Sequence, residues 1–281
     1  MNAFVDALTP GTKVGDCVLD QAIGQGASGI VYRAKHPRLG TVAVKEYFPK
    51  QIASRQKAGT LRPSTQEWQE SWDKGIADLK EEAEALRRLR HASIVKVHEH
   101  IEEHGTIYIV MELIDGRPIS KILDEGRILR PEEIERIAAD LLDALRHLHR
   151  RGVIHRDIAP DNVLLLANGE PVLIDFGSAR LQLAHLPQTL NAAVKSGYSP
   201  IENYAAGATA SLATVGPWTD IYSTAALLYR LVSNVPPADA VSRMHEAVAK
   251  RESDAVTPLA IRARTFKGFR PEFLAAIDAG M

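Results

Sequence analysis

The sequence has little of several features that mark specialised classes of protein. Cys17 is its single cysteine, which excludes an internal disulfide framework and fits a reducing compartment, so we expect a cytoplasmic protein. No apolar run approaches the roughly 18 residues that span a bilayer, and the N-terminus lacks the basic-then-apolar pattern of a signal peptide. The formal net charge of −1 gives no basic excess for a nucleic-acid surface. We therefore expect no nucleic-acid partner and no membrane contact within this chain.

Two short polar runs, on either side of a predicted hairpin, carry the strongest signal that is present. The runs are His155-Arg156-Asp157-Ile158-Ala159-Pro160-Asp161-Asn162 and Asp175-Phe176-Gly177. Apolar segments flank the turn at residues 167–170 between them, which predicts two buried strands. Because a hairpin brings its open ends together, Asp157, Asn162 and Asp175 should converge. Two carboxylates and an amide oxygen suit Mg²⁺, and one carboxylate could stay free to accept a proton.

A glycine-rich turn near the N-terminus is the second signal. Residues 18–23 and 30–34 are predicted strands, and Gly24-Gln25-Gly26-Ala27-Ser28-Gly29 lies between them. A helix after such glycines would favour a dinucleotide-binding fold, but here a β-branched strand follows at once. The glycines are therefore expected at a hairpin tip, where backbone N–H groups can approach a phosphate closely. An ordinary glycine-rich turn is the alternative.

A charged residue inside an apolar strand gives the third signal. The predicted strand covers residues 41–45 and ends at Lys45. A buried lysine is costly unless it is paired. Residues 78–90 have the apolar periodicity of a helix. At about 100° per residue, Glu82 falls on its apolar stripe, whereas Glu81 and Glu84 fall on the solvent face. We therefore expect an ion pair between Lys45 and Glu82.

The connection between these two elements is unusually long. It covers residues 46–75, is largely polar, and contains Trp68 and Trp72. Loops of this length are usually functional or partly ordered. We expect the two tryptophans to pack the insert back onto its own lobe. Beyond it, strands are predicted at 94–97 and 106–112, and the remainder of the chain is predicted to be mainly helical.

In this order the motifs resemble those of the protein kinases, and the chain is similar to the bacterial, eukaryotic-like serine/threonine protein kinases over about residues 14–277. The resemblance implies an α+β, bilobal protein-kinase fold. A lead-in over residues 1–16 would precede a small β-rich N-lobe over 17–112, which includes the insert at about 46–75. A larger, mainly helical C-lobe would cover 113–281, and we expect it to be truncated at its C-terminal end.

The resemblance also implies ATP and Mg²⁺ as cofactors, and a set of site residues. Asp157 would accept the proton of the substrate hydroxyl, while Lys45, braced by Glu82, would hold the α- and β-phosphates. Asn162 and Asp175 would bind Mg²⁺. The implied nucleotide-binding residues are Ile23, Gly24, Gly26, Gly29, Val31, Ala43, Lys45, Met111, Glu112, Ile114 and Leu164. The apolar members of this set could equally be plain core.

Further roles are implied outside the nucleotide-binding set. His155 is expected to pack rather than to transfer a proton, and Asp220 is expected to tie its helix to the catalytic loop. Arg156 is a cation that requires an anion, and we expect it to pair with a phosphorylated residue of the segment after Asp175. Thr189 is the first candidate for that modification.

Two positions depart from the family pattern. Ala159 stands where serine/threonine kinases usually have a lysine, so one contact to the γ-phosphate would be missing. Lys195-Ser196 stands where a threonine usually helps to seat the substrate hydroxyl. We favour the hypothesis that Lys195 supplies the missing cation from the activation segment. The alternative is that nothing compensates for Ala159.

Two interpretations of function follow from the resemblance. One is an ATP-dependent kinase that phosphorylates serine and threonine hydroxyls of protein substrates, autophosphorylates and acts in bacterial signalling. The other is a pseudokinase that serves as a nucleotide-dependent binding module. The intact set of Lys45, Glu82, Asp157, Asn162 and Asp175 favours catalysis. The oligomeric state is left open.

Overall fold

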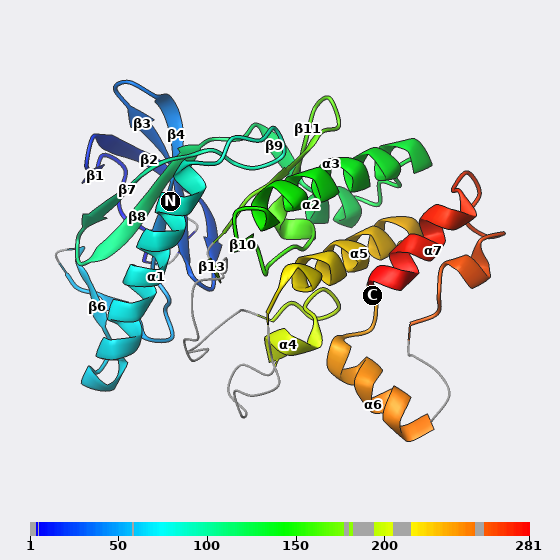
Figure 1. Cartoon of the computed structure of the whole chain (residues 1–281). Coiled ribbons are helices and arrows are strands. Elements are labelled where there is room, and N and C mark those ends of the chain that lie inside the picture. Colours follow the sequence, from blue (N-terminus) through cyan, green and yellow to red (C-terminus); the bar gives the residue numbers. More distant parts are fainter. Residues whose placement is uncertain are drawn as a thin grey trace. The chain divides into compact units, whose positions relative to one another are not determined.

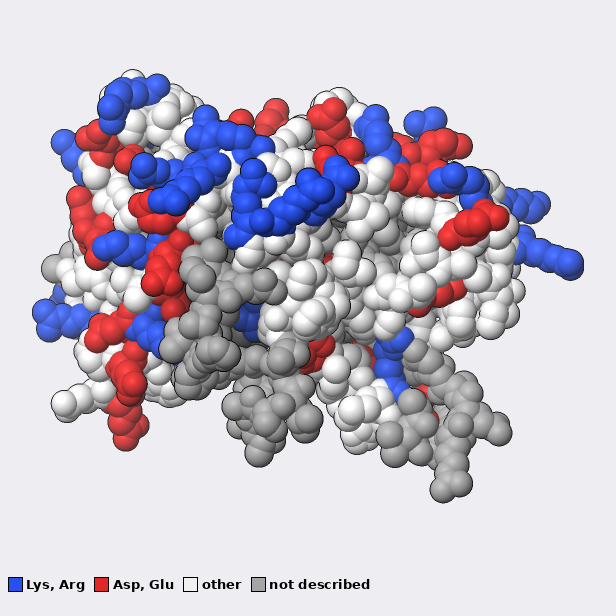
Figure 2. All heavy atoms as spheres, in the orientation of Figure 1, with Lys and Arg blue, Asp and Glu red and all other residues white. Residues whose placement is uncertain are grey.

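The structure is a computed structural model, and it divides into two compact units (Figure 1). It describes residue 4 and residues 6–57, 59–176, 180–181, 194–204, 215–250 and 256–281. The first unit comprises Met1–Arg90 and Val95–Ile114, and the second comprises His91–Ile94 and Asp115–Met281. No helix within these described ranges is long and apolar enough to cross a bilayer. Figure 2 shows both acidic and basic side chains on the visible face, with uncharged surface between them.

The first unit is built on an antiparallel sheet of six strands, in the order β1-β2-β3-β4-β8-β7. Its strands are β1 (Lys13–Val14), β2 (Cys17–Gly26), β3 (Gly29–His36), β4 (Gly40–Tyr47), β7 (Val97–Glu103) and β8 (Thr106–Glu112). A small hairpin of β5 (Ala53–Arg55) and β6 (Leu61–Pro63), a 3₁₀ turn η1 (Gln66–Trp68) and the helix α1 (Gln69–Arg87) complete it. The inner strands are buried over residues 42–46 of β4 and 106–111 of β8, as expected for strands covered on both faces.

One predicted strand is wrong. The strand expected at 94–97 is β7, which runs over Val97–Glu103 and pairs with β8. Ile94 belongs to the second unit, where it forms a parallel bridge with Leu173. The apolar pair Ile94 and Val95 looked like strand core, whereas β7 is an edge strand whose largely polar sequence hides its periodicity.

The insert is ordered into the hairpin β5–β6 and the first turns of α1, which begins at Gln69 rather than at residue 78. Trp72 is buried and stacks on Tyr47 with 5.3 Å between ring centroids. Gly75 makes this approach possible, because a Cβ there would lie 2.1 Å from the Tyr47 hydroxyl oxygen. Trp68 packs against the same core, so both tryptophans hold the insert to its own unit as expected.

A fully buried carboxylate, Glu46, lies beneath this insert. Both of its oxygens accept hydrogen bonds from the Arg55 guanidinium, at 3.0 and 2.6 Å, and each accepts one more from the hydroxyl of Tyr32 or Tyr108, both at 2.9 Å. We call these four residues the Glu46 cluster. A buried charge is tolerated when it is paired and hydrogen-bonded in this way. Burial, together with the negative charge of Glu46, raises the pKa of both tyrosines, so they stay protonated donors.

The Glu46 cluster reaches two further segments of the first unit. The Arg55 Nε donates to the carbonyl of Asp6 at 2.7 Å, and its Nη1 donates to the carbonyl of Gly59 at 2.9 Å. The Tyr32 hydroxyl accepts the N–H of Leu8 at 3.0 Å. The lead-in and the β5–β6 hairpin are therefore both anchored to strand β4, which also carries Lys45.

The second unit is mainly helical. Its elements are β9 (Gly116–Pro118), α2 (Ile119–Asp124), α3 (Pro131–His149), β10 (Val153–Ile154), η2 (Pro160–Asn162), β11 (Val163–Leu166), β12 (Pro171–Leu173), β13 (Arg180–Leu181), α4 (Ile201–Tyr204), α5 (Pro217–Ser233), α6 (Ala240–Lys250), η3 (Ala260–Arg262) and α7 (Pro271–Gly280). The helix α5 lies between α3 and α7 (Figure 1) and is buried at most positions. Helix α3 begins at Pro131, where Glu133 accepts the N–H of Arg130 at 2.8 Å.

The predicted hairpin is present as β11 and β12. Val163 opposes Leu173 and Leu164 opposes Val172, and β9 adds a third strand along β11. The first polar run thus leads into β11 and the second follows β12, so both lie at the open end of this hairpin.

We expect Arg55→Met to lower the free energy of unfolding by about 3–5 kcal/mol, because it leaves the Glu46 carboxylate buried without its cation. Urea denaturation measures the difference. Arg33→Met is the matched control: Arg33 makes a comparable pair with Asp20, but these side chains are 40% and 42% exposed, and such a pair contributes less than about 1 kcal/mol. Equal losses in the two variants would contradict a special role for the cluster.

Candidate active site

The loop with the first polar run is held by one buried carboxylate, that of Asp220 on α5. It accepts the N–H of His155 at 2.9 Å and the N–H of Arg156 at 2.8 Å. It also contacts the Nε2 of His149 at 2.7 Å. Arg156 has φ of +68°, a left-handed conformation that is rare outside glycine and that these bonds hold in place. The expected tie between Asp220 and the catalytic loop is observed.

The structure brings Asp157 and Asn162 together at the end of the hairpin. The Asn162 Nδ2 donates to the backbone carbonyl of Asp157 and to its Oδ2, both at 2.8 Å. The carbonyl of Asn162 accepts the N–H of Ile174 at 2.9 Å, which joins this loop to the residue before Asp175. The open ends of the hairpin therefore meet, as its geometry predicted.

The side chains at this junction fit a hard cation. Because the Asn162 Nδ2 donates to two acceptors, the amide is fixed with its Oδ1 as the remaining ligand atom. Asp175 supplies a carboxylate next to the hairpin end. Across the described ranges there is no group of three or more His, Cys, Asp or Glu side chains placed to hold a metal. Mg²⁺ does not require one, since it is usually held by one or two carboxylates together with waters and substrate phosphates.

The carboxylate of Asp157 has an unusual environment. Burial raises its pKa and the nearby charge of Asp175 raises it further, whereas Lys195 and His155 lower it. The Lys195 Nζ lies 3.2 Å from the Asp157 Oδ1. A group that must accept a proton benefits from a pKa nearer to the working pH, so this environment suits a general base.

His155 is a packing residue in this structure. Its ring is fully buried and lies 4.5 Å from that of Phe176, centroid to centroid. Burial lowers the pKa of its imidazole, and its Nδ1 faces the N–H of Asp157 at 3.3 Å. The ring accepts the hydrogen bond from the Asp157 backbone and otherwise packs against Phe176.

In the first unit, Lys45 and Glu82 are both buried, with 7% and 5% of their surfaces exposed. Lys45 lies on β4, opposite Val31 of β3 and Ile109 of β8. Glu82 is on the buried stripe of α1, where helical periodicity placed it. The pairing of these two side chains stays a prediction.

The glycines of the β2–β3 hairpin differ in what they contact. A Cβ at Gly29 would lie 1.8 Å from the carbonyl oxygen of Glu46, so packing alone requires glycine there. A Cβ at Gly24 would make one ordinary contact at 3.9 Å, and one at Gly26 would meet nothing within 4 Å. Ile23 beside them leaves 41% of its surface exposed. Protein packing explains Gly29, whereas the open space at Gly24 and Gly26 is consistent with a ligand.

The remaining predicted nucleotide-binding residues lie on strands or at their ends. Ala43 and Met111 are buried and oppose each other on β4 and β8. Glu112 donates its N–H to the carbonyl of Lys96 at 2.9 Å, so this N–H is already used within the protein. The predicted contact of Glu112 and Ile114 with an adenine stays a prediction. Val31 on β3, Ile114 just after β8 and Leu164 on β11 are partly buried.

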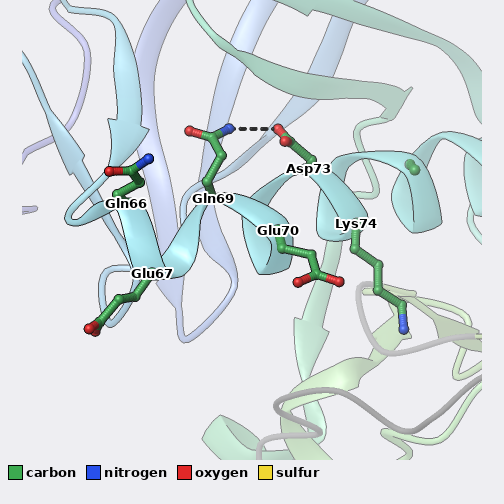
Figure 3. Close-up of a pocket in the computed structure, with 7 residues that line it drawn as sticks. Gln66, Glu67, Gln69, Glu70, Asp73 and Lys74 are labelled. Atoms are coloured by element: carbon green, nitrogen blue, oxygen red, sulfur yellow. Dashed lines mark hydrogen bonds between the residues drawn. The ribbon is translucent and has the colours of Figure 1, made fainter.

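An open hollow at the start of α1 is a separate feature (Figure 3). Its lining residues are Gln66, Glu67, Gln69, Glu70, Asp73, Lys74 and Ala77. Gln69 donates to Asp73 at 2.9 Å, and no predicted site residue reaches the hollow. It gives no support to a binding role.

Two predicted features, Gly177 and the candidate phosphorylation site Thr189, lie outside the described residues. Arg156 is buried, with its backbone fixed by Asp220. Its pairing with a phosphorylated Thr189 stays a prediction.

Comparison with known proteins agrees with this arrangement. The family described as "Protein kinase domain" matches residues 17–268, most of the chain. The chain belongs to the protein kinase family. The protein-kinase fold and the resemblance to bacterial, eukaryotic-like serine/threonine kinases, both expected from the motifs, are confirmed.

The chain is similar to two curated proteins of Streptomyces coelicolor. It is 34% identical to "Probable serine/threonine-protein kinase SCO3848" over 226 residues, which cover 78% of this chain and 30% of that protein. It is 32% identical to "Serine/threonine-protein kinase PkaA" over 253 residues, which cover 86% of this chain and 44% of that protein. The chain thus spans less than half the length of these relatives. Among solved structures, "PpkA-294 apo form" matches with a TM-score of 0.79 and 31% identity, covering 98% of this chain and 92% of that chain.

The contrast between the two hairpin glycines predicts separable effects. Gly29→Ala should destabilise the protein by about 1–3 kcal/mol, since its Cβ collides with backbone. Gly26→Ala meets open space and should change the free energy of unfolding by less than about 0.5 kcal/mol, yet weaken Mg-ATP binding roughly fivefold. Denaturation and calorimetry on both variants test this. Unchanged ATP affinity in Gly26→Ala would favour the ordinary turn.

Proposed function

We propose that this protein kinase transfers the γ-phosphoryl group of ATP to serine and threonine hydroxyls of protein substrates. The observation that carries the proposal is the partly buried Asp157 carboxylate, oriented by Asn162 at the end of the β11–β12 hairpin. The preference for serine and threonine is supported by the printed names of the relatives. A place in bacterial signalling, in the cytoplasm, is proposed on the same likeness and on the single cysteine.

Asp157 is proposed as the group that receives the proton. A substrate hydroxyl donates to one Asp157 oxygen as its own oxygen forms a bond to the γ-phosphorus. The bond from that phosphorus to the bridging oxygen breaks, ADP leaves, and the proton passes to Asp157. Asn162 and Asp175 would hold Mg²⁺, which when bound with ATP offsets the charge of the phosphates. Phosphoryl transfer needs little covalent help, so positioning and charge supply most of the rate.

The first unit would bind the nucleotide. Lys45, buried on β4, is proposed to contact the α- and β-phosphates, with Glu82 as its counter-charge. Gly24 and Gly26 leave space for phosphates to approach the backbone. Autophosphorylation belongs to the same proposal, because the segment after Asp175 carries hydroxyl side chains.

Asp157→Asn should abolish transfer, by at least about 1,000-fold, while Mg-ATP binding stays within about threefold of the parent, because Asp157 is not a proposed metal ligand. A radiolabel transfer assay and calorimetry measure the two quantities. Asp161→Asn removes an exposed carboxylate from the same loop and should be nearly neutral. Parental transfer by Asp157→Asn would refute the assignment. A parent that binds Mg-ATP without transferring phosphate would instead support a pseudokinase.

A further inference from the structure

The two oxygens of the Asp157 carboxylate are held by different elements. The Oδ2 accepts the Nδ2 of Asn162 at 2.8 Å, from the loop that Asp157 itself belongs to. The Oδ1 pairs with the Nζ of Lys195 at 3.2 Å, from a segment that begins beyond the undescribed residues 182–193. The side chains of the pair are 25% and 14% exposed, so the charges interact with little screening by water.

The backbone around Lys195 is built as a tight turn. The carbonyl of Lys195 accepts the N–H groups of Tyr198 and Ser199, each at 2.9 Å. The N–H of Lys195 donates to the hydroxyl of Ser199 at 2.9 Å, and Ser199 is buried. Gly197 has φ of +82°, and a Cβ there would lie 2.6 Å from the carbonyl oxygen of Pro237. The turn is thus fixed against the fold, and the lysine is presented to Asp157 from an ordered base.

The position two residues after Asp157 on the catalytic loop carries no charge. Ala159, next but one to Asp157, is buried and apolar. His155 is fully buried and packs against Phe176. The Asp157 carboxylate makes its ion pair with a cation from another element, Lys195.

We propose that Lys195 is a positioning residue for phosphoryl transfer: it fixes the orientation of the Asp157 carboxylate and brings a positive charge to the place where the phosphoryl group moves. The inference rests on the proposed function. Of the two carboxylate oxygens, Oδ1 is held by a long, flexible side chain, whereas Oδ2 is held by an amide on the rigid loop. The substrate hydroxyl therefore takes Oδ1, and the displaced ammonium stays near the transferring group, where it offsets charge.

The experiment compares Lys195→Met, which removes the charge at similar length, with Lys195→Arg, which keeps it. The readouts are kcat and KM for Mg-ATP in the full chain, with Mg-ATP affinity from calorimetry. Lys195→Met should lower kcat about 100-fold and leave KM and affinity within about threefold. Lys195→Arg should recover at least about a tenth of the parental kcat, since the charge is restored with different geometry. The control is Lys121→Met, an exposed lysine of α2, which should match the parent.

Ser199→Ala gives a second, independent test. It keeps the charge of Lys195 and removes the side-chain hydrogen bond that fixes the turn, so kcat should fall about fivefold with no change in Mg-ATP affinity. A thermal unfolding scan of every variant shows whether Lys195→Met is folded. If it is not, Ser199→Ala still tests the proposal.

Three results would overturn the proposal: a parental kcat for Lys195→Met, equal losses for Lys195→Met and Lys195→Arg, or a parental kcat for Ser199→Ala. Asp157→Asn in the same assay separates this proposal from the proposed function. An inactive Asp157→Asn beside a fully active Lys195→Met would reject the lysine alone. A fully active Asp157→Asn would reject the assigned base, and the role of Lys195 with it.

Discussion

The geometry of the candidate site depends on the buried carboxylate of Asp220. Three donors converge on it: a ring nitrogen of His149 on α3 and the backbone N–H groups of His155 and Arg156 on the loop. These bonds hold Arg156 in a left-handed conformation that a free chain would seldom adopt. The loop turns at this point, and the turn sets the direction in which Asp157 leaves it. A residue on α5, far along the chain, thus fixes the backbone from which the Asp157 side chain extends.

The same principle governs Asp157 itself, whose position is set by groups from three elements. His155 accepts its N–H, Asn162 donates to one carboxylate oxygen, and Lys195 pairs with the other. Since Lys195 stands on the turn before α4, the electrostatic state of the carboxylate depends on how that turn is folded. A rearrangement of the turn that carries Lys195 would therefore change the charge environment of Asp157, the proposed base, without moving the loop that carries Asp157. This couples chemistry to conformation through a single ion pair.

Local patterns predicted much of the fold and of the site. The hairpin after Asn162 follows from apolar segments on either side of a turn, and the burial of Glu82 follows from helical periodicity. Both patterns lie within a short stretch of sequence. Glu46 was missed: its partners come from three other strands, and only its place among apolar residues of β4 could have signalled a buried charge. The start of α1 was missed because the polar residues after Gln69 show weak periodicity. A role for Lys195 at the catalytic loop was expected from the family resemblance and not from a local pattern, because its pairing with Asp157 is a tertiary contact.

Strand β4 carries opposite charges at consecutive positions, Lys45 and Glu46, and successive residues of a strand point to opposite faces. A slip of one residue against β3 and β8 would exchange the two faces. A slip that brings Lys45 to the place of Glu46 would set an ammonium against Arg55, and a slip in either direction would remove the acceptor for two buried tyrosine hydroxyls. Misregistered sheets are therefore penalised by like-charge repulsion as well as by lost packing. Glu46 thus helps to fix the register of β4, the strand that positions Lys45.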